Sequence, residues 1–147
     1  MNKNKEYLIR TMKGLSDHMQ NLFNELDHES DPTGMVCDYP FIFFKEEKEE
    51  VYKCFSLRYF EIFEISFKME DDKEILVIKH DEENELTAAI MHTDEVFSEI
   101  FPSTHVNQLY YAMIEIVQFL KHSCRCLWQH DRAMAKFIKS SRYGASI

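Results

Sequence analysis

The sequence predicts an α+β fold in which helices and strands are segregated along the chain. Apolar residues recur at helical spacing over residues 5–26, strand-like segments with polar turns follow up to residue 91, and helical spacing returns after residue 92. We therefore expect an N-terminal helix, an antiparallel meander of about four or five strands, and two or three C-terminal helices packing on one sheet face. The length of 147 residues suits a single domain, 1–147, in which residues 140–147 form a flexible tail.

The first helix is expected from Lys5 to Leu26. Its apolar residues recur at intervals of three and four, which forms a seam along one side of a helix: Leu8, Met12, Leu15, Met19, Leu22 and Leu26. Gly14 lies within this helix and weakens it by about 1 kcal/mol relative to alanine. The segment Asp27–Gly34 is rich in turn-forming residues, so the helix should end there.

The middle of the chain predicts strands separated by short polar turns. They are expected at Met35–Phe44, within Val51–Met69 as one or two strands, at Ile75–Lys79 and at Leu86–Met91. Around Ile62 and Phe63 the apolar residues change parity, so either both sheet faces are covered or a β-bulge resets the face. We favour the bulge, which leaves four residues facing outward: Glu61, Glu64, Ser66 and Lys68.

Helices are expected again after residue 92. Two sites can cap them: Thr93 or Asp94 before a short helix ending at Phe101, and Ser103 or Thr104 before a long helix. The long helix carries apolar residues around much of its circumference, so it needs cover on more than one side. One side would meet the sheet, and another would meet the N-terminal helix, the segment Ala133–Ile138 or a second subunit.

The formal net charge of −9 is unevenly distributed. Residues 45–99 carry 7 basic and 17 acidic groups, whereas residues 100–147 carry 6 basic and 2 acidic groups. An acidic surface repels the phosphate backbone, so direct nucleic-acid binding is not expected. The acidic groups fall at predicted turns, where they form either a solvated rim or a surface for a basic partner.

His122, Cys126 and His130 follow one another at intervals of four and would share one face of a helix. Imidazole and thiolate groups bind zinc, but His122 and His130 would lie about 12 Å apart along the axis, too far for one ion. A single histidine–cysteine pair would need ligands from elsewhere in the chain, or would act as a base and a thiol nucleophile. The spacing matches no established zinc motif.

Aromatic residues make up 14% of the chain, and in the predicted strands they occupy both parities. One covered sheet face cannot hide all of them, and exposed aromatic residues are typical anchors of protein interfaces. The expected partner-binding residues are Phe43, Phe44, Tyr59, Phe60, Tyr111, Glu46, Glu47, Asp71 and Asp72.

We therefore expect a non-enzymatic protein-binding module of the inhibitor, immunity, adaptor or chaperone type that needs no cofactor. A cytoplasmic location is expected because the N-terminus lacks an apolar signal segment and no run of apolar residues is long enough to span a membrane. A homodimer through either long helix is compatible with this function. One alternative is an acidic nucleic-acid mimic that occupies a basic groove, and another is a metal- or thiol-dependent enzyme centred on His122–His130.

Overall fold

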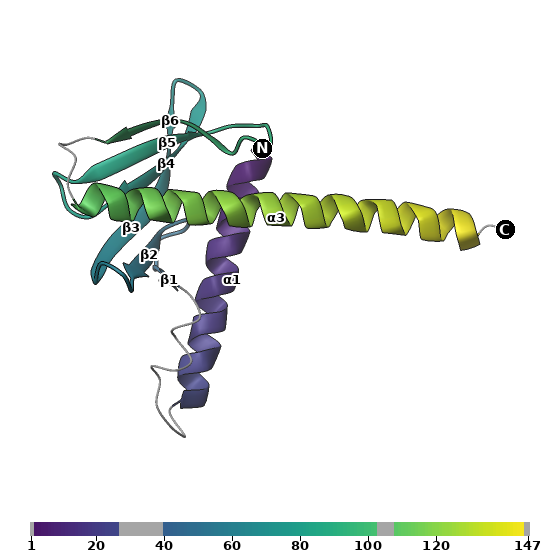
Figure 1. Ribbon diagram of the computed structural model, residues 1–147, viewed down its shortest axis with the longest axis horizontal. Helices are drawn as coiled ribbons and strands as arrows, with labels where there is room; N and C mark the ends of the chain where they lie inside the picture. Colours follow the sequence, from purple (N-terminus) through teal and green to yellow (C-terminus); the bar gives the residue numbers. More distant parts are fainter. Residues whose placement is uncertain (1, 27–39, 103–107, 146–147) are drawn as a thin grey trace.

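The computed structural model describes residues 2–26, 40–102 and 108–145, which form two long helices and a sheet (Figure 1). The elements in chain order are α1 (Lys3–Leu26), β1 (Phe41–Lys45), β2 (Tyr52–Ser56), β3 (Glu61–Glu70), β4 (Lys73–Lys79), β5 (Glu85–Ile90), β6 (Phe97–Pro102) and α3 (Gln108–Ala145). All six strands pair antiparallel in sequence order. The predicted α+β class and the antiparallel meander are confirmed, with more strands and fewer C-terminal helices than expected.

Both helices pack into one core cluster on one face of the sheet, called here the inner face. Alternate strand residues supply its fully buried side chains: Phe43, Cys54, Phe63, Ile65, Leu76, Ile78, Leu86 and Ala88. Leu8 and Met12 from α1 and Leu120 from α3 are also fully buried in this cluster. The seam predicted for the first helix therefore faces the core over its N-terminal half.

The prediction of a short helix ending at Phe101 is wrong, because this segment forms β6. A backbone hydrogen bond of 2.8 Å from Met91 N to Val96 O closes the turn before β6. A register shift between Ala88 and Ala89 then lets Phe97, which is buried, and Ile100 both pack against the core. Apolar residues three positions apart are typical of a helix, and the irregular strand produces the same spacing.

The β-bulge predicted at Ile62 and Phe63 is also wrong. Pairing of β3 with β2 and β4 is regular along its length. Phe60 lies in the turn before β3, Ile62 is 56% exposed on the outer face, and Phe63 is buried on the inner face. Glu61 shares the parity of Phe63 and so does not point outward as expected. Three other residues lie on the outer face as expected: Glu64, Ser66 and Lys68.

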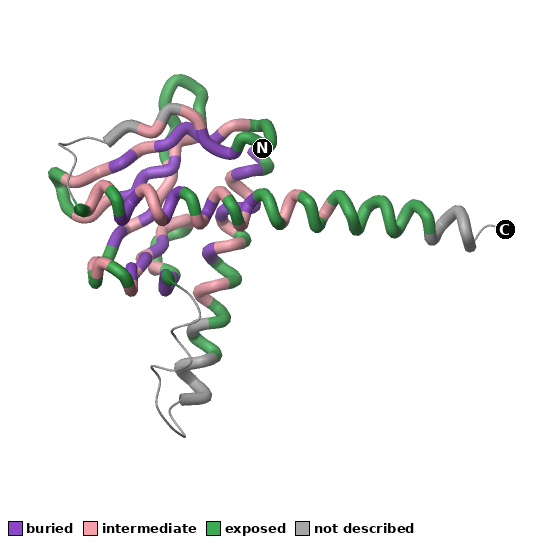
Figure 2. Tube along the Cα trace, in the orientation of Figure 1, coloured by how far each residue is buried: buried purple, intermediate pink, exposed green. Residues whose placement is uncertain are grey.

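In the described part of the chain after residue 92 there is one helix, α3, where two or three were expected. It has 38 residues and is about 57 Å long. The segment Ala133–Ile138 continues this helix and does not fold back to cover it, because no glycine or proline interrupts the sequence before Gly144. Residues 132–140, called here the arm, are all exposed and project beyond the sheet and α1 (Figure 2). The expected tail from Ser140 overlaps the last turns of α3.

The N-terminus of α1 is attached to the β5–β6 turn by two buried asparagines. Asn2 Oδ1 accepts hydrogen bonds from the backbone nitrogens of Asn4 and Lys5, at 3.0 and 3.3 Å, and thus caps the helix. Asn4 Nδ2 donates to the carbonyl oxygens of Met91 and Thr93 at 2.6 and 2.7 Å. The helix therefore begins two residues before the predicted Lys5.

Parts of three predictions lie outside the described residues. They are the end of the first helix at Asp27–Gly34, the first residues of the strand Met35–Phe44, and the capping pair Ser103 and Thr104. The described part of that strand is β1.

Candidate interaction surfaces

The β2–β3 turn presents the most exposed large apolar side chain among those described, Phe60, which is 76% exposed. Phe60 N donates a 2.9 Å hydrogen bond to Ser56 O, and Tyr59 N donates to Ser56 Oγ at 3.3 Å. The turn closes with Phe60 in the left-handed region, at φ 54°. An L-residue with a bulky side chain costs about 1–2 kcal/mol there, whereas glycine and asparagine adopt it readily.

Apolar residues of the outer face extend the surface around Phe60. Its ring meets the edge of Phe55 with centroids 5.9 Å apart. Phe55 pairs with Ile62 on one side and with Ile42 on the other. Phe60, Phe55 and Ile62 thus form one apolar patch, called here the turn patch, of which Phe60 and Ile62 are the exposed members.

Arg58 connects the same turn to the first part of α3. Its guanidinium forms an ion pair with Glu115 and lies 5.5 Å from the ring centroid of Tyr59. Tyr111, which is 56% exposed, lies one helical turn before Glu115. The structure therefore brings three predicted partner-binding residues, Tyr59, Phe60 and Tyr111, to the same end of the sheet.

An acidic cluster around His80 lies beside the start of β3. His80 Nε2 is 2.8 Å from Glu61 Oε2, and His80 Nδ1 is 3.4 Å from Asp81 Oδ2. The hydrogen bond with Glu61 raises the pKa of His80 above its ordinary value, although partial burial opposes this effect. Backbone N–H groups of Asn84 and Glu83 lower the pKa of Asp81. Asp81 therefore remains ionised at neutral pH at this end of the sheet.

We expect replacement of His80 by glutamine to reduce stability in acid more than in base. Because the pKa of His80 is raised on folding, its protonated form stabilises the fold fully below the ordinary value of 6.5. This contribution disappears as the pH rises through the folded-state pKa. Urea unfolding at pH 5.5 and pH 8.5 should show a larger loss for His80→Gln at pH 5.5. The same substitution at the exposed His92 is the control. An equal loss of stability at both pH values for His80→Gln would contradict the expectation.

Phe43 is not exposed, although the sequence analysis expected it among the residues that contact a partner. It is fully buried on the inner face and stacks on Phe119 of α3 with ring centroids 6.0 Å apart. Its neighbour Phe44 points to the other side of the strand and is 41% exposed. Tyr59 is half-buried and packs against the core. The alternation of β1 explains why two adjacent phenylalanines have opposite environments.

The predicted acidic residues lie at the end of the sheet opposite to Phe60. Glu46 and Glu47 belong to the β1–β2 turn, and Asp71 and Asp72 to the β3–β4 turn. Within the described part of the chain, none of these four forms an ion pair. The β4–β5 turn, which follows His80, lies at the same end of the sheet as Phe60, and so does Glu61 at the start of β3. The structure thus places Tyr59, Phe60 and Tyr111 at one end of the sheet and these four acidic residues at the other, where Phe44 also lies.

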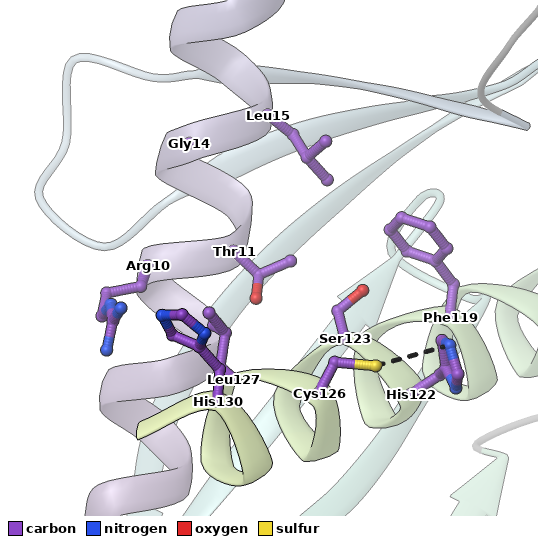
Figure 3. A pocket seen from close by; sticks show the side chains of 10 residues that line it. All are labelled: Arg10, Thr11, Gly14, Leu15, Phe119, His122, Ser123, Cys126, Leu127 and His130. Carbon is purple, nitrogen blue, oxygen red and sulfur yellow. Dashed lines mark hydrogen bonds between the residues drawn. The ribbon is translucent and has the colours of Figure 1, made fainter. Parts of the chain in front are cut away.

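A cleft of about 610 Å³ separates α1 from α3 where the two helices cross (Figure 3). Side chains of both helices point into it, and it is open to solvent along one side. The lining residues are Arg10, Thr11, Gly14, Leu15, Phe119, His122, Ser123, Cys126, Leu127 and His130. Only the histidine and cysteine residues were candidates in the sequence analysis, and the other seven were not, because they come together only where α1 crosses α3.

All three predicted metal candidates line this cleft. Cys126 Sγ lies 3.6 Å from His122 Nε2, while His130 lies a turn further along α3 (Figure 3). Among the described residues, no group of three or more histidine, cysteine or acidic side chains is placed to hold a metal ion. The other described cysteines are buried, and burial raises the pKa of Cys124 to about 11 and that of Cys54 further. Those two thiols therefore stay protonated at neutral pH.

No protein-family model, curated protein or solved structure matches this chain. Within the described ranges, neither helix has an apolar stretch long enough to cross a bilayer.

Proposed function

We propose that this chain is a non-enzymatic protein-binding module that docks a protein partner at the turn patch. The observation that carries this proposal is the exposed Phe60 in a left-handed conformation. A bulky residue in this region is costly to the fold, and such strain concentrates at binding sites and active sites. Packing within the turn does not explain a phenylalanine at this position, because Phe60 is 76% exposed.

The surroundings of the turn patch favour a partner with basic groups beside an apolar anchor pocket. Glu61 is the first residue of β3 and directly follows Phe60, and Asp81 lies close to it because His80 contacts both carboxylates. The one cation of the turn, Arg58, is already paired with Glu115. An aromatic anchor provides most of the binding energy at such interfaces, and the surrounding charges select and orient the partner.

Replacement of Phe60 by asparagine is expected to leave the free energy of unfolding unchanged or to raise it by up to about 1 kcal/mol. Relief of the left-handed strain would offset the loss of the edge contact with Phe55, which is worth about 0.5–1.5 kcal/mol. Phe60→Ala is the matched control, since alanine loses the ring and retains the strain. Urea denaturation should therefore rank the asparagine variant above the alanine variant. The reverse order would show that the left-handed backbone conformation at position 60 is not strained.

Partner binding is tested by placing the photoreactive p-benzoylphenylalanine at position 60 in the cells that make this protein. His92, which is exposed at the other end of the sheet, supplies the control position. We expect a protein adduct specific to position 60. The captured protein is then purified, and its Kd is measured for the wild type, Phe60→Asn and Ile62→Ser.

Loss of a central anchor typically weakens binding by at least about 2 kcal/mol, which is about 30-fold in Kd. We expect this loss for Phe60→Asn, with no loss of stability to account for it. Failure to obtain an adduct specific to position 60 would refute the proposal. A captured protein that binds Phe60→Asn as tightly as the wild type would refute it equally.

A further inference from the structure

Cys126 is the exposed member of the three cysteines that the structure describes. It lines both the cleft between α1 and α3 and a second, smaller hollow on α3. Its Sγ lies 3.6 Å from Nε2 of His122, a distance at which the imidazole can accept the thiol proton (Figure 3). A cysteine beside a base is the usual arrangement of a thiol that reacts as a nucleophile. The pair therefore offers a chemistry that docking at the turn patch does not use.

The second hollow, called here the basic hollow, has a volume of about 300 Å³ and is lined by residues of α3. These residues form two rows in which the spacing is four: Gln118, His122 and Cys126 in one row, and Lys121, Arg125 and Gln129 in the other. Residues four apart follow one another along one side of a helix, and residues three apart are neighbours in adjacent rows. The nucleophile and its base therefore form one wall of the hollow, and two cations belong to the other.

The basic hollow is positively charged in an otherwise acidic protein. Lys121 and Arg125 line this hollow and not the cleft. Within the described ranges, neither of them forms an ion pair. The acidic residues that flank the hollow in the sequence, Glu115 and Asp131, are already paired with arginines of other elements. An anion is therefore attracted to the hollow, whereas a cation is repelled.

We propose that Cys126 is a modification site that forms a mixed disulfide with a small anionic disulfide, one that carries carboxylate groups beside its S–S bond. His122 is the base, and Lys121 and Arg125 attract the carboxylates. Zinc fits this pair less well, because the described residues place no third ligand beside it and because the two cations repel a metal ion. The basic hollow is separate from the turn patch, so this proposal and the proposed function stand or fall independently.

The exchange balances without any further oxidant. His122 Nε2 accepts the thiol proton of Cys126, and the resulting thiolate attacks one sulfur of the disulfide. A bond forms between Cys126 Sγ and that sulfur while the original S–S bond breaks. The leaving thiolate then takes up the proton from His122. Cys126 is thereby oxidised to a mixed disulfide, and half of the reagent is reduced to a free thiol.

Three small disulfides of different charge test the proposal on the reduced full chain. Oxidised glutathione is anionic, bis(2-hydroxyethyl) disulfide is neutral and cystamine is cationic. Mass spectrometry of proteolytic peptides gives the rate at Cys126 and distinguishes it from Cys37, which lies outside the described residues. Each rate is divided by the rate of N-acetylcysteine amide with the same disulfide, which removes the differences between the leaving thiolates. We expect this relative rate to be at least about tenfold higher for oxidised glutathione than for cystamine, and to fall for glutathione as salt increases.

Replacement of the two cations tests the source of this selectivity. Lys121→Gln/Arg125→Gln should lower the preference for oxidised glutathione over the neutral disulfide at least about fivefold. Lys136→Gln/Lys139→Gln is the matched control, because it removes the same charge from the arm, outside the basic hollow. The control should retain the preference of the wild type.

Replacement of the base tests the role of His122. His122→Gln should slow the reaction of Cys126 with all three disulfides at pH 7, because the thiol loses its proton acceptor. His130→Gln is the control, since it removes the other histidine that lines the cleft. Phe60→Asn should leave all three rates unchanged, which separates this test from that of the proposed function.

Several results would overturn the proposal. Absence of an adduct on Cys126 is one of them. Equal relative rates for the three disulfides would show that Cys126 is only an exposed thiol. An unchanged preference in Lys121→Gln/Arg125→Gln would remove the basic hollow from the site. Equal rates for His122→Gln and the wild type would remove the base.

Discussion

Replacement of Phe43 by alanine is expected to lower the free energy of unfolding by about 3–5 kcal/mol. Its side chain is fully buried on the inner face of β1, where its ring stacks on Phe119 of α3. Removal of the ring loses the transfer free energy of the side chain and leaves a cavity between β1 and α3. Phe119 also lines the cleft, so this contact joins the core to the cleft wall.

Phe60→Ala is the matched control for this substitution, because it removes the same atoms from an exposed position. It should cost no more than about 1.5 kcal/mol, the upper value of an aromatic pair contact. Urea unfolding monitored by circular dichroism measures both variants. A loss below about 2 kcal/mol for Phe43→Ala would contradict its place in the core.

Replacement of Asn4 by aspartate is expected to lower the free energy of unfolding at pH 7 by about 3–5 kcal/mol, the cost of an uncompensated buried charge. Asn4 is 4% exposed, and its Nδ2 donates to two carbonyl oxygens at 2.6 and 2.7 Å. A carboxylate oxygen in its place is an acceptor facing two acceptors. The substitution should therefore detach the N-terminus of α1 from the β5–β6 turn.

The pH dependence separates this effect from a simple loss of hydrogen bonds. The site disfavours the ionised form, so the pKa of the new carboxyl would be higher in the folded state than in the unfolded state. The loss should therefore be smallest below about pH 4, the ordinary value for aspartate, and should grow as the pH rises. Asn4→Ala removes the donors without adding charge and should lose stability equally at pH 4 and pH 7, relative to the wild type. A pH-independent loss for Asn4→Asp would contradict the assignment of Nδ2 as the donor.

The parts of the fold that were predictable are those in which one periodicity dominates. The seam beginning at Leu8 and Met12 indicates a helix with one buried side, and the polar turns between strands indicate a meander. The failures occur where one spacing fits two structures. Phe97 and Ile100 have a helical spacing because the strand is irregular, and Ile62 breaks the alternation because it is an exposed apolar residue.

The candidate surfaces were less predictable than the fold. Phe60 and Tyr111 were expected to bind a partner because the chain is rich in aromatic residues. Composition alone, however, does not tell which aromatic residues are exposed. The cleft depends on the crossing of α1 and α3, and its wall includes Gly14, which the sequence marks only as a weak point of a helix. The extension of the arm was visible as the absence of glycine and proline before Gly144. We instead considered Ala133–Ile138 as one possible cover for the long helix, because that helix carries apolar residues around much of its circumference.

The continuity of α3 has a consequence for how the arm stays helical. A free peptide of this length would rarely be helical in water, because formation of the first turn is unfavourable and isolated helices shorter than about 12–15 residues are marginal. The arm avoids this step, since the turns before it are already fixed in the core by residues such as Leu120 and Cys124. Each further turn only propagates an existing helix. The body of the protein therefore acts as a nucleus that keeps the exposed arm helical.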